Sequence, residues 1–346
     1  MRLGSTRQSN FELLRLLSMF FIVFYHLLLR FHHVNDSFGW MQALWLPLHV
    51  GVVCFVLISG YFGIRTSSRG LLLYLSFLFV YSLPDIVFGI KDSQSVHDIF
   101  HSLMFVSRTK YWFALTYLGL YLVAPLMNRF FQNSSIREQW YLLAVFALIS
   151  IYLGNFARSR TYFEGKNLVN FLFIYQIGHL LIVYAPKWQA FDKRKLVCCY
   201  LALNAVLVSS YLLFNSKWLG DVIWRLSFPY NSPVLIVNAV LLFMIIGQLE
   251  FHSLFVNRMA EGCFAIYLIH SSSPLIEFFQ RPVIDKLFAV SHGNSFLFIL
   301  FLFVFAIVIM VCCIAINTCM NESYLEKSIS LGWHITGENR FLSFTK

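Results

Sequence analysis

Apolar residues form long blocks along the chain, separated by short segments that carry most of the charged side chains. The blocks are about 17–22 residues long, the length at which a helix crosses a hydrocarbon core of about 30 Å. Because backbone amides in lipid must be satisfied internally, we expect helices rather than strands. The pattern predicts an all-α polytopic membrane protein with about ten transmembrane helices. The expected spans are residues 11–31, 44–64, 70–90, 111–131, 139–156, 168–184, 196–214, 232–249, 262–280 and 294–316.

Composition agrees with this class. Of the 346 residues, 59% are hydrophobic and only 12% are charged, whereas a soluble domain carries roughly a quarter charged residues. The net charge of +10 is spread over the loops and forms no basic face. It therefore indicates membrane topology rather than binding to nucleic acid.

The distribution of Lys and Arg predicts the orientation. The first expected loop, 32–43, has no Lys or Arg, whereas the second contains Arg65 and Arg69. Positive loops stay in the cytoplasm, so both termini are expected there. The first apolar block lacks a small-x-small cleavage site and is interpreted as a retained helix. We expect an integral membrane domain over 1–316 and a cytoplasmic tail over 317–346.

The cysteines give no sign of a metal or redox site. None of the seven forms a C-x-x-C pair, and most lie inside apolar blocks. They are interpreted as small buried or lipid-facing residues, and neither a metal nor a bound cofactor is predicted.

Ionisable residues inside a span cost roughly 2.5–3.5 kcal/mol each on insertion scales, so each one is a candidate for function. The candidates within the expected spans are Glu12, Arg15, His26, Asp85, His270 and Glu277, with His49, His179 and Asp221 nearer the edges. Arg15 and His26 stand eleven residues apart. That spacing is about 20° beyond three helical turns and about 16.5 Å along the axis, so both side chains share one face.

Each candidate also has a structural interpretation. Arg15 alone is typical of an arginine that extends to lipid headgroups, and His26 alone is typical of a helix–helix contact. Glu12, three residues before Arg15, is placed to hold the guanidinium. Arg65 and Arg69 fit either a topology signal or an anion site.

The ninth expected span carries a further pair of candidates. His270 and Glu277 are seven residues apart, near two turns, and are expected on one face, where they support the site or join helices. Asp85, which follows Pro84, is interpreted as a satisfied polar residue at a helix break rather than an acceptor contact.

Several segments resemble signatures of the membrane acyltransferase-3 family, whose members O-acylate bacterial surface polysaccharides and related acceptors. The stretch from Glu12 to His26 resembles its R-x10-H signature. The segments FVLISGY at 55–61, YWFALTYLGLYLVAPLMN at 111–128 and CFAIYLIH at 263–270 resemble later helix motifs, in the same order. The likeness covers about residues 10–315. Many members have a small residue where this chain has Leu16 and an Asp where it has Glu12. Some members carry a fused extracytoplasmic domain that these residues do not contain.

The resemblance implies a bacterial inner-membrane acyltransferase, with cytosolic acyl-CoA (acetyl-CoA expected) as co-substrate and a glycan hydroxyl as acceptor. It also implies catalytic roles for His26 and Arg15, with Arg65 and Arg69 as candidates for binding the CoA phosphates. A buried neutral imidazole suits both a general base and a nucleophile that forms an acyl-imidazole. A lipid-linked glycan flippase is the main alternative, but no inverted repeat is evident in the sequence.

Overall fold

The computed structural model describes residues 8–34, 39–91, 111–214 and 218–320, together with residues 95, 103 and 104. Within these residues every regular element is helical, which confirms the predicted all-α class. The main helices are α1 (Ser9–Val34), α2 (Trp45–Leu48), α3 (Val50–Phe62), α4 (Ser68–Lys91), α6 (Trp112–Asn133), α7 (Ile136–Ala147), α8 (Leu168–Val183), α9 (Ala185–Gln189), α10 (Lys193–Phe214), α11 (Trp218–Ser227), α12 (Pro233–Gly247), α13 (Leu254–Glu261), α14 (Cys263–His270), α16 (Arg281–Val290) and α17 (Ser295–Met320).

Six helical stretches in the described part of the chain are long and apolar enough to cross a membrane. They are Ser9–His32, Trp40–Phe62, Ser68–Lys91, Ile136–Phe156, Lys193–Phe214 and Ser295–Met320. Each of them coincides with an expected span, so a multi-pass membrane protein is confirmed. The sixth and eighth expected spans correspond to α8 and α12, which are apolar but shorter. The fourth corresponds to α6, which has 22 residues but is not among the six.

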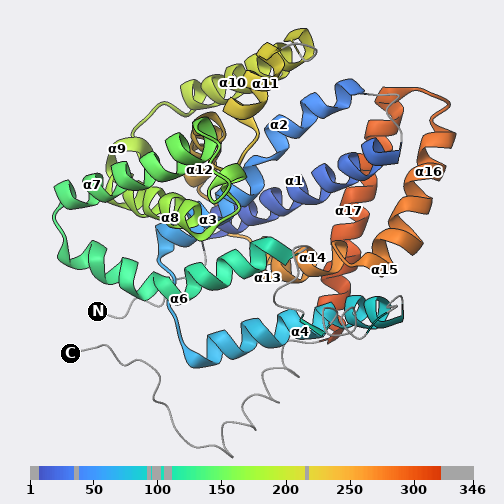
Figure 1. The fold of residues 1–346 in the computed structure, drawn as a ribbon, viewed down its shortest axis with the longest axis horizontal. Helices are drawn as coiled ribbons and strands as arrows, with labels where there is room; N and C mark the ends of the chain where they lie inside the picture. Colours follow the sequence, from blue (N-terminus) through green and yellow to red (C-terminus); the bar gives the residue numbers. More distant parts are fainter. Residues whose placement is uncertain are drawn as a thin grey trace, which may run out of the picture.

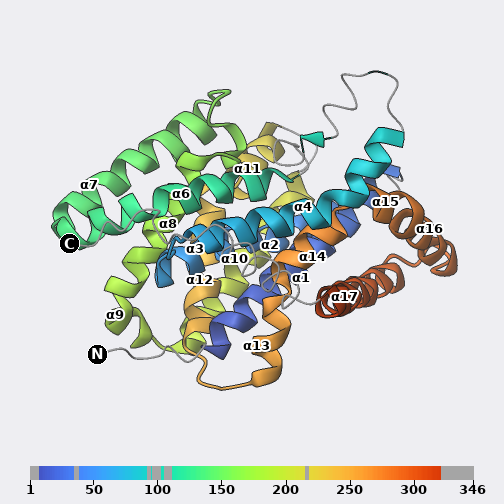
Figure 2. The same cartoon turned by 90° about the horizontal axis from the view of Figure 1, so that it is seen from below.

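Helix α1 lies in the interior of the bundle, where it contacts α3, α12, α13, α14 and α17 (Figure 1). Figures 1 and 2 place α7 and α9 at one end of the long axis of the molecule and α16 and α17 at the other. This central position allows one face of α1 to border a cavity while its other faces remain packed.

The closest helix pair is α3 with α8, and it depends on two glycines. A Cβ on Gly60 would lie 2.0 Å from the carbonyl oxygen of Tyr175, and one on Gly178 would lie 2.3 Å from that of Leu57. Small residues of this kind let membrane helices approach closely. Helix α3 then ends at Gly63, whose φ of 72° is the left-handed conformation that favours glycine at a helix terminus.

The ninth expected span, residues 262–280, is not one helix. Helix α14 ends at His270. Helical structure begins again after Ser272, as α15 (Ser273–Leu275) and the π-helical turn η5 (Ile276–Gln280). The reason is visible in Ser-Ser-Ser-Pro at 271–274: Ser272 is an extended N-cap, and Pro274 follows in the first turn. The prediction that His270 and Glu277 share a helix face is therefore wrong.

Asp85 does not mark a break in its own helix, because α4 continues through Pro84 to Lys91. Its buried carboxylate instead accepts the amide of Ser273 at 2.7 Å and the hydroxyl of Tyr111 at 2.5 Å. Asp85, on α4, thus caps the N-terminus of α15. The expected tail at 317–346 lies largely outside the described residues, and α17 continues to Met320.

Candidate functional site

One stripe of α1 borders a cavity. Arg15, Met19, Ile22 and His26 all line it, and their spacings of four, three and four residues bring them onto one helix face. The sequence prediction that Arg15 and His26 face the same space is therefore confirmed by the geometry. The cavity has a volume of about 480 Å³, within the range of roughly 300–1,000 Å³ usual for small-molecule sites.

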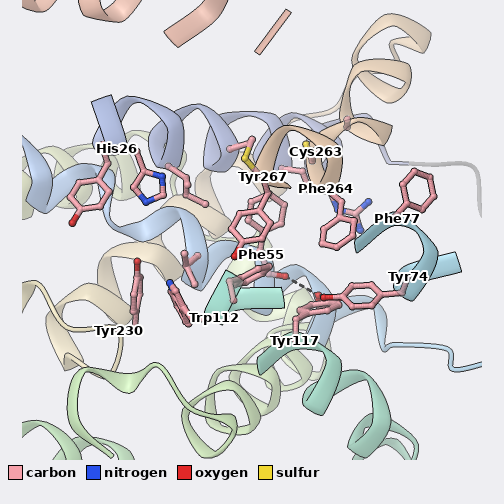
Figure 3. A pocket seen from close by; sticks show the side chains of 18 of the residues that line it. His26, Phe55, Tyr74, Phe77, Trp112, Tyr117, Tyr230, Cys263, Phe264 and Tyr267 are labelled. Atoms are coloured by element: carbon pink, nitrogen blue, oxygen red, sulfur yellow. Dashed lines mark hydrogen bonds between the residues drawn. The ribbon is translucent and has the colours of Figure 1, made fainter. Parts of the chain in front are cut away.

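Aromatic side chains form most of the rest of this wall, and we call it the aromatic cavity. They come from α1, α3, α4, α6, α14 and the loop before α12: Tyr25, Phe55, Tyr74, Phe77, Trp112, Phe113, Tyr117, Tyr230, Phe264 and Tyr267. Figure 3 shows His26, Trp112 and Tyr230 toward one end of the cavity and Tyr74, Phe77 and Phe264 toward the other. The cavity is thus an apolar passage with polar groups at its two ends.

Arg15 lines the aromatic cavity three turns of α1 before His26 and is held by Glu12. Its Nη1 donates to both carboxylate oxygens of Glu12, at 3.0 and 3.1 Å. The Glu12 side chain is only 9% exposed, whereas that of Arg15 is 37% exposed. The pairing expected from their spacing is therefore present, and it orients a cation at an accessible mouth. Gly70 and Glu261 line the cavity at this end of α1 as well.

A second cavity, of about 400 Å³, adjoins the first near His26. Its wall carries five charged side chains, and we call it the charged cavity: Arg158, Glu164, Lys166, Asp221 and Arg225. Lys166 pairs with Glu164 at 2.7 Å and lies 5.9 Å from the centre of the Trp112 ring. The wall also contains Trp224, Phe228 and Pro229, so donors, acceptors and aromatic faces occur together.

The two cavities share a boundary. Both are lined by Tyr25, His26, His49, Trp112 and Tyr230. His26 is therefore accessible from both sides, and it is the candidate residue closest to both compartments.

His26 also contacts a partner from the far end of the chain. Its Nδ1 lies 2.9 Å from Nε2 of His270, and the two nearly parallel rings meet edge to edge, with their centres 5.2 Å apart. Nδ1 of His270 lies 2.7 Å from the carbonyl oxygen of Ile266, one turn earlier in α14. The hydroxyl of Ser271 also lies 3.2 Å from Nε2 of His270. A chain of hydrogen bonds thus runs from the backbone of α14 to His26.

This chain fixes the tautomers of both neutral rings. A carbonyl oxygen only accepts, so Nδ1 of His270 carries the proton and its Nε2 is an acceptor. Nδ1 of His26 must then donate to that acceptor. The unprotonated Nε2 of His26 is left with its lone pair, which is the form required of a base or nucleophile.

The backbone carbonyl that the helix break leaves at His270 is hydrogen-bonded by two side chains. The carbonyl oxygen of His270 accepts from Nε2 of Gln280 at 2.9 Å and from Nη2 of Arg30 at 3.3 Å. Nη1 of Arg30 donates to the side-chain oxygen of Gln280. Arg30 and Gln280 were not predicted from the sequence. A deep arginine one turn after His26 was a usable signal, whereas nothing local marks Gln280.

The remaining candidates lie elsewhere. Arg65, in the loop between α3 and α4, and Arg69, in the first turn of α4, are exposed. Neither lines the two cavities among the described residues, although Gly70, which follows Arg69, lines the aromatic cavity. Glu277 pairs with Arg281 at 2.7 Å, with its side chain 40% exposed. The residues that the structure describes contain no cluster of His, Cys, Asp and Glu able to hold a metal ion.

Comparison with known proteins gives one result. A family model described as an acyltransferase domain, of the acyltransferase-3 type, matches residues 8–318. No match was found among curated proteins or among solved structures. The matched segment includes every described residue that lines the aromatic cavity and the charged cavity.

Proposed function

This chain belongs to the membrane acyltransferase-3 family and is an acyltransferase, and we propose that it transfers an acyl group from cytosolic acyl-CoA to a hydroxyl of a cell-surface or lipid-linked glycan. The observation that carries the proposal is that two cavities of opposite character meet at His26. The aromatic cavity takes the donor and the charged cavity takes the acceptor.

The aromatic cavity suits the donor because its ends match the two ends of the CoA arm. Arg15, held by Glu12, provides a cation for the phosphates at the mouth. Arg65 and Arg69, five positions and one position before Gly70, add positive charge outside it. The apolar walls then hold the pantetheine and acyl group, with the thioester near His26. Acetyl-CoA is the donor we expect.

The charged cavity suits a carbohydrate. Sugars present many hydroxyls, and these require side chains that both donate and accept hydrogen bonds. Lys166 and Glu164, beside the Trp112 ring, provide such groups. Asp221 and Arg225, 3.5 Å apart on α11, add a second donor and acceptor pair.

The two cavities also agree with the proposed topology, in which both termini are cytoplasmic and the protein resides in the bacterial inner membrane. The aromatic cavity reaches Gly70, at the expected cytoplasmic end of the third span, and Glu261, in a loop expected to be cytoplasmic. The charged cavity reaches Arg158, Lys166 and Asp221, in the loops expected on the outer side. Acyl transfer at His26 therefore moves the acyl group, but not CoA, across the membrane.

A direct test uses the protein purified in detergent with radiolabelled acetyl-CoA. We expect release of the CoA thiol with the wild-type protein and its loss in His26→Ala, at unchanged expression and monodispersity. Glycan extracted from the membranes of the host bacterium is added to test transfer of label. The absence of any CoA-dependent turnover would support the alternative function, a flippase for a lipid-linked glycan.

A further inference from the structure

A second histidine, His49, lies at the boundary of the two cavities and has no role in the reaction described above. It connects α2 to α3 and is only 6% exposed. Its ring stacks between Phe228 at 3.9 Å and Tyr230 at 4.5 Å. The imidazole is therefore held in one plane by aromatic neighbours from the loop before α12.

The tautomer of neutral His49 is fixed as firmly as its plane. Nδ1 lies 2.7 Å from the carbonyl oxygen of Phe228, so it must carry the proton and donate. Nε2 consequently has the lone pair. Among the described residues no group hydrogen-bonds this atom. His49 lines both cavities, so the site contains a second oriented base.

The two histidines have different surroundings. His26 is hydrogen-bonded to His270, whose partners lie in α14, whereas His49 is fixed by the loop at 228–230, which lines the charged cavity. Tyr25 lies between them, with its ring centre 5.4 Å from that of His26 and 4.9 Å from that of His49. A single nitrogen cannot carry an acyl group and accept a proton at the same time, so two bases permit two consecutive steps.

We propose that His26 receives the acyl group from the thioester and that His49 removes the proton from the acceptor hydroxyl. This inference rests on the acyltransferase function proposed above, and it selects the acyl-imidazole route over a single general base. It also assigns a catalytic residue outside the R-x10-H stretch.

In the first step Nε2 of His26 attacks the thioester carbonyl carbon. The C–S bond breaks, and CoA leaves as the thiolate. The Nδ1 proton of His26 moves to Nε2 of His270, 2.9 Å away, which leaves a neutral acyl-imidazole.

In the second step the acceptor oxygen attacks the acyl carbon while its proton moves to Nε2 of His49. The C–N bond breaks, its electron pair returns to His26, and His26 recovers the Nδ1 proton from His270. The proton on His49 finally neutralises the CoA thiolate, so that thioester and hydroxyl become ester and thiol.

The test requires no knowledge of the acceptor, because water replaces it slowly. Purified protein is mixed with acetyl-CoA, and thiol release is followed from the first turnover. The variant is His49→Asn, whose side-chain amide retains a donor for the Phe228 carbonyl but has no group at the position of Nε2. Hydroxylamine is then added as an acceptor that attacks through its nitrogen lone pair without a base.

For the wild type we expect a burst of about one thiol per protein, followed by slow hydrolysis. In His49→Asn the burst should persist, steady hydrolysis should fall about 10²-fold or more, and hydroxylamine should restore turnover. His26→Ala should show neither burst nor rescue. The proposal is overturned if His49→Asn hydrolyses acetyl-CoA as fast as the wild type, or if it loses the burst together with turnover. The absence of thiol release from the wild type would instead reject the acyltransferase function itself.

Discussion

The two cavities differ in what lines them although they meet at the same histidines. The aromatic cavity has an apolar wall with one oriented cation, Arg15, at its mouth. The charged cavity has five charged side chains, of which Lys166 and Glu164 form a close pair beside Trp112. One wall suits a long flexible arm with a charged end, and the other suits a polar molecule with many hydroxyls.

Under the proposed function, the difference allows one membrane protein to bind two substrates of opposite character. Charged groups are costly in the membrane interior, so the donor passage keeps its charge at the end. The proposed acceptor side carries its charges between residues 158 and 166 and on α11, where the paired side chains are partly exposed to water. Changes in each cavity should therefore affect one substrate and not the other, whereas changes at the boundary should affect both.

The largest effect is expected at the boundary. Of the four α1 residues that line the aromatic cavity on one helix face (Arg15, Met19, Ile22 and His26), only His26 also lines the charged cavity. His26→Ala should therefore lower kcat by about 10²–10⁴-fold with any acceptor. The measurement is thiol release under saturating acetyl-CoA. His252→Ala, at an exposed loop position, is the matched control and should leave the rate unchanged.

Arg15→Ala should affect the donor side alone. A hydrogen bond to a charged group contributes about 1.5–3 kcal/mol, so the KM for acetyl-CoA should rise about 10- to 100-fold. The KM for the acceptor should not change. Arg258→Ala removes an exposed arginine from α13 and serves as the control. An unaltered donor KM in Arg15→Ala would mean that this arginine only contacts lipid headgroups.

His270 tests whether the tautomer of His26 matters. His270→Asn keeps a donor for the Ile266 carbonyl but removes the acceptor of the His26 proton. We expect kcat to fall about tenfold, because the Nδ1–H group of His26 would lose its acceptor and a buried donor without a partner costs about 1–3 kcal/mol. His270→Gln places an amide oxygen near the former Nε2 and should recover part of that loss. Equal rates for both variants would contradict a positioning role.

The smallest effect is expected in the charged cavity. Lys166 is 45% exposed and paired, and exposed pairs contribute about 0–1 kcal/mol. Lys166→Ala should therefore raise the acceptor KM about two- to fivefold and leave the donor KM unchanged. Lys187→Ala, on the exposed side of α9, is the control. A rise in donor KM for Lys166→Ala would contradict the division between the cavities.

The sequence was most informative where the signal is local. The apolar blocks predicted α1, α4 and α17, and a spacing of eleven residues placed Arg15 and His26 on one wall. The ninth span was predicted wrongly because the apolar average concealed the N-cap and proline at 271–274. That break is what frees the His270 carbonyl for Arg30 and Gln280.

Contacts between distant segments could not be predicted in this way. His26 and His270 are 244 positions apart, and His49 meets a carbonyl 179 positions away. No spacing or propensity links such pairs, because the packing of α1, α3 and α14 brings them together. Of the charges in the charged cavity, only Asp221 was a candidate in the sequence, whereas Lys166 and Glu164 had no local signal that distinguished them from other loop residues.

The central claim is that acyl groups enter by the aromatic cavity and leave by the charged one. Inverted membrane vesicles, which expose the cytoplasmic face, are supplied with radiolabelled acetyl-CoA outside. The account predicts that label accumulates in glycan inside the vesicles, inaccessible to added esterase until detergent is present, and that His26→Ala abolishes it. Label that remains accessible on the outer face, or that appears only when acetyl-CoA is trapped within, would contradict the account.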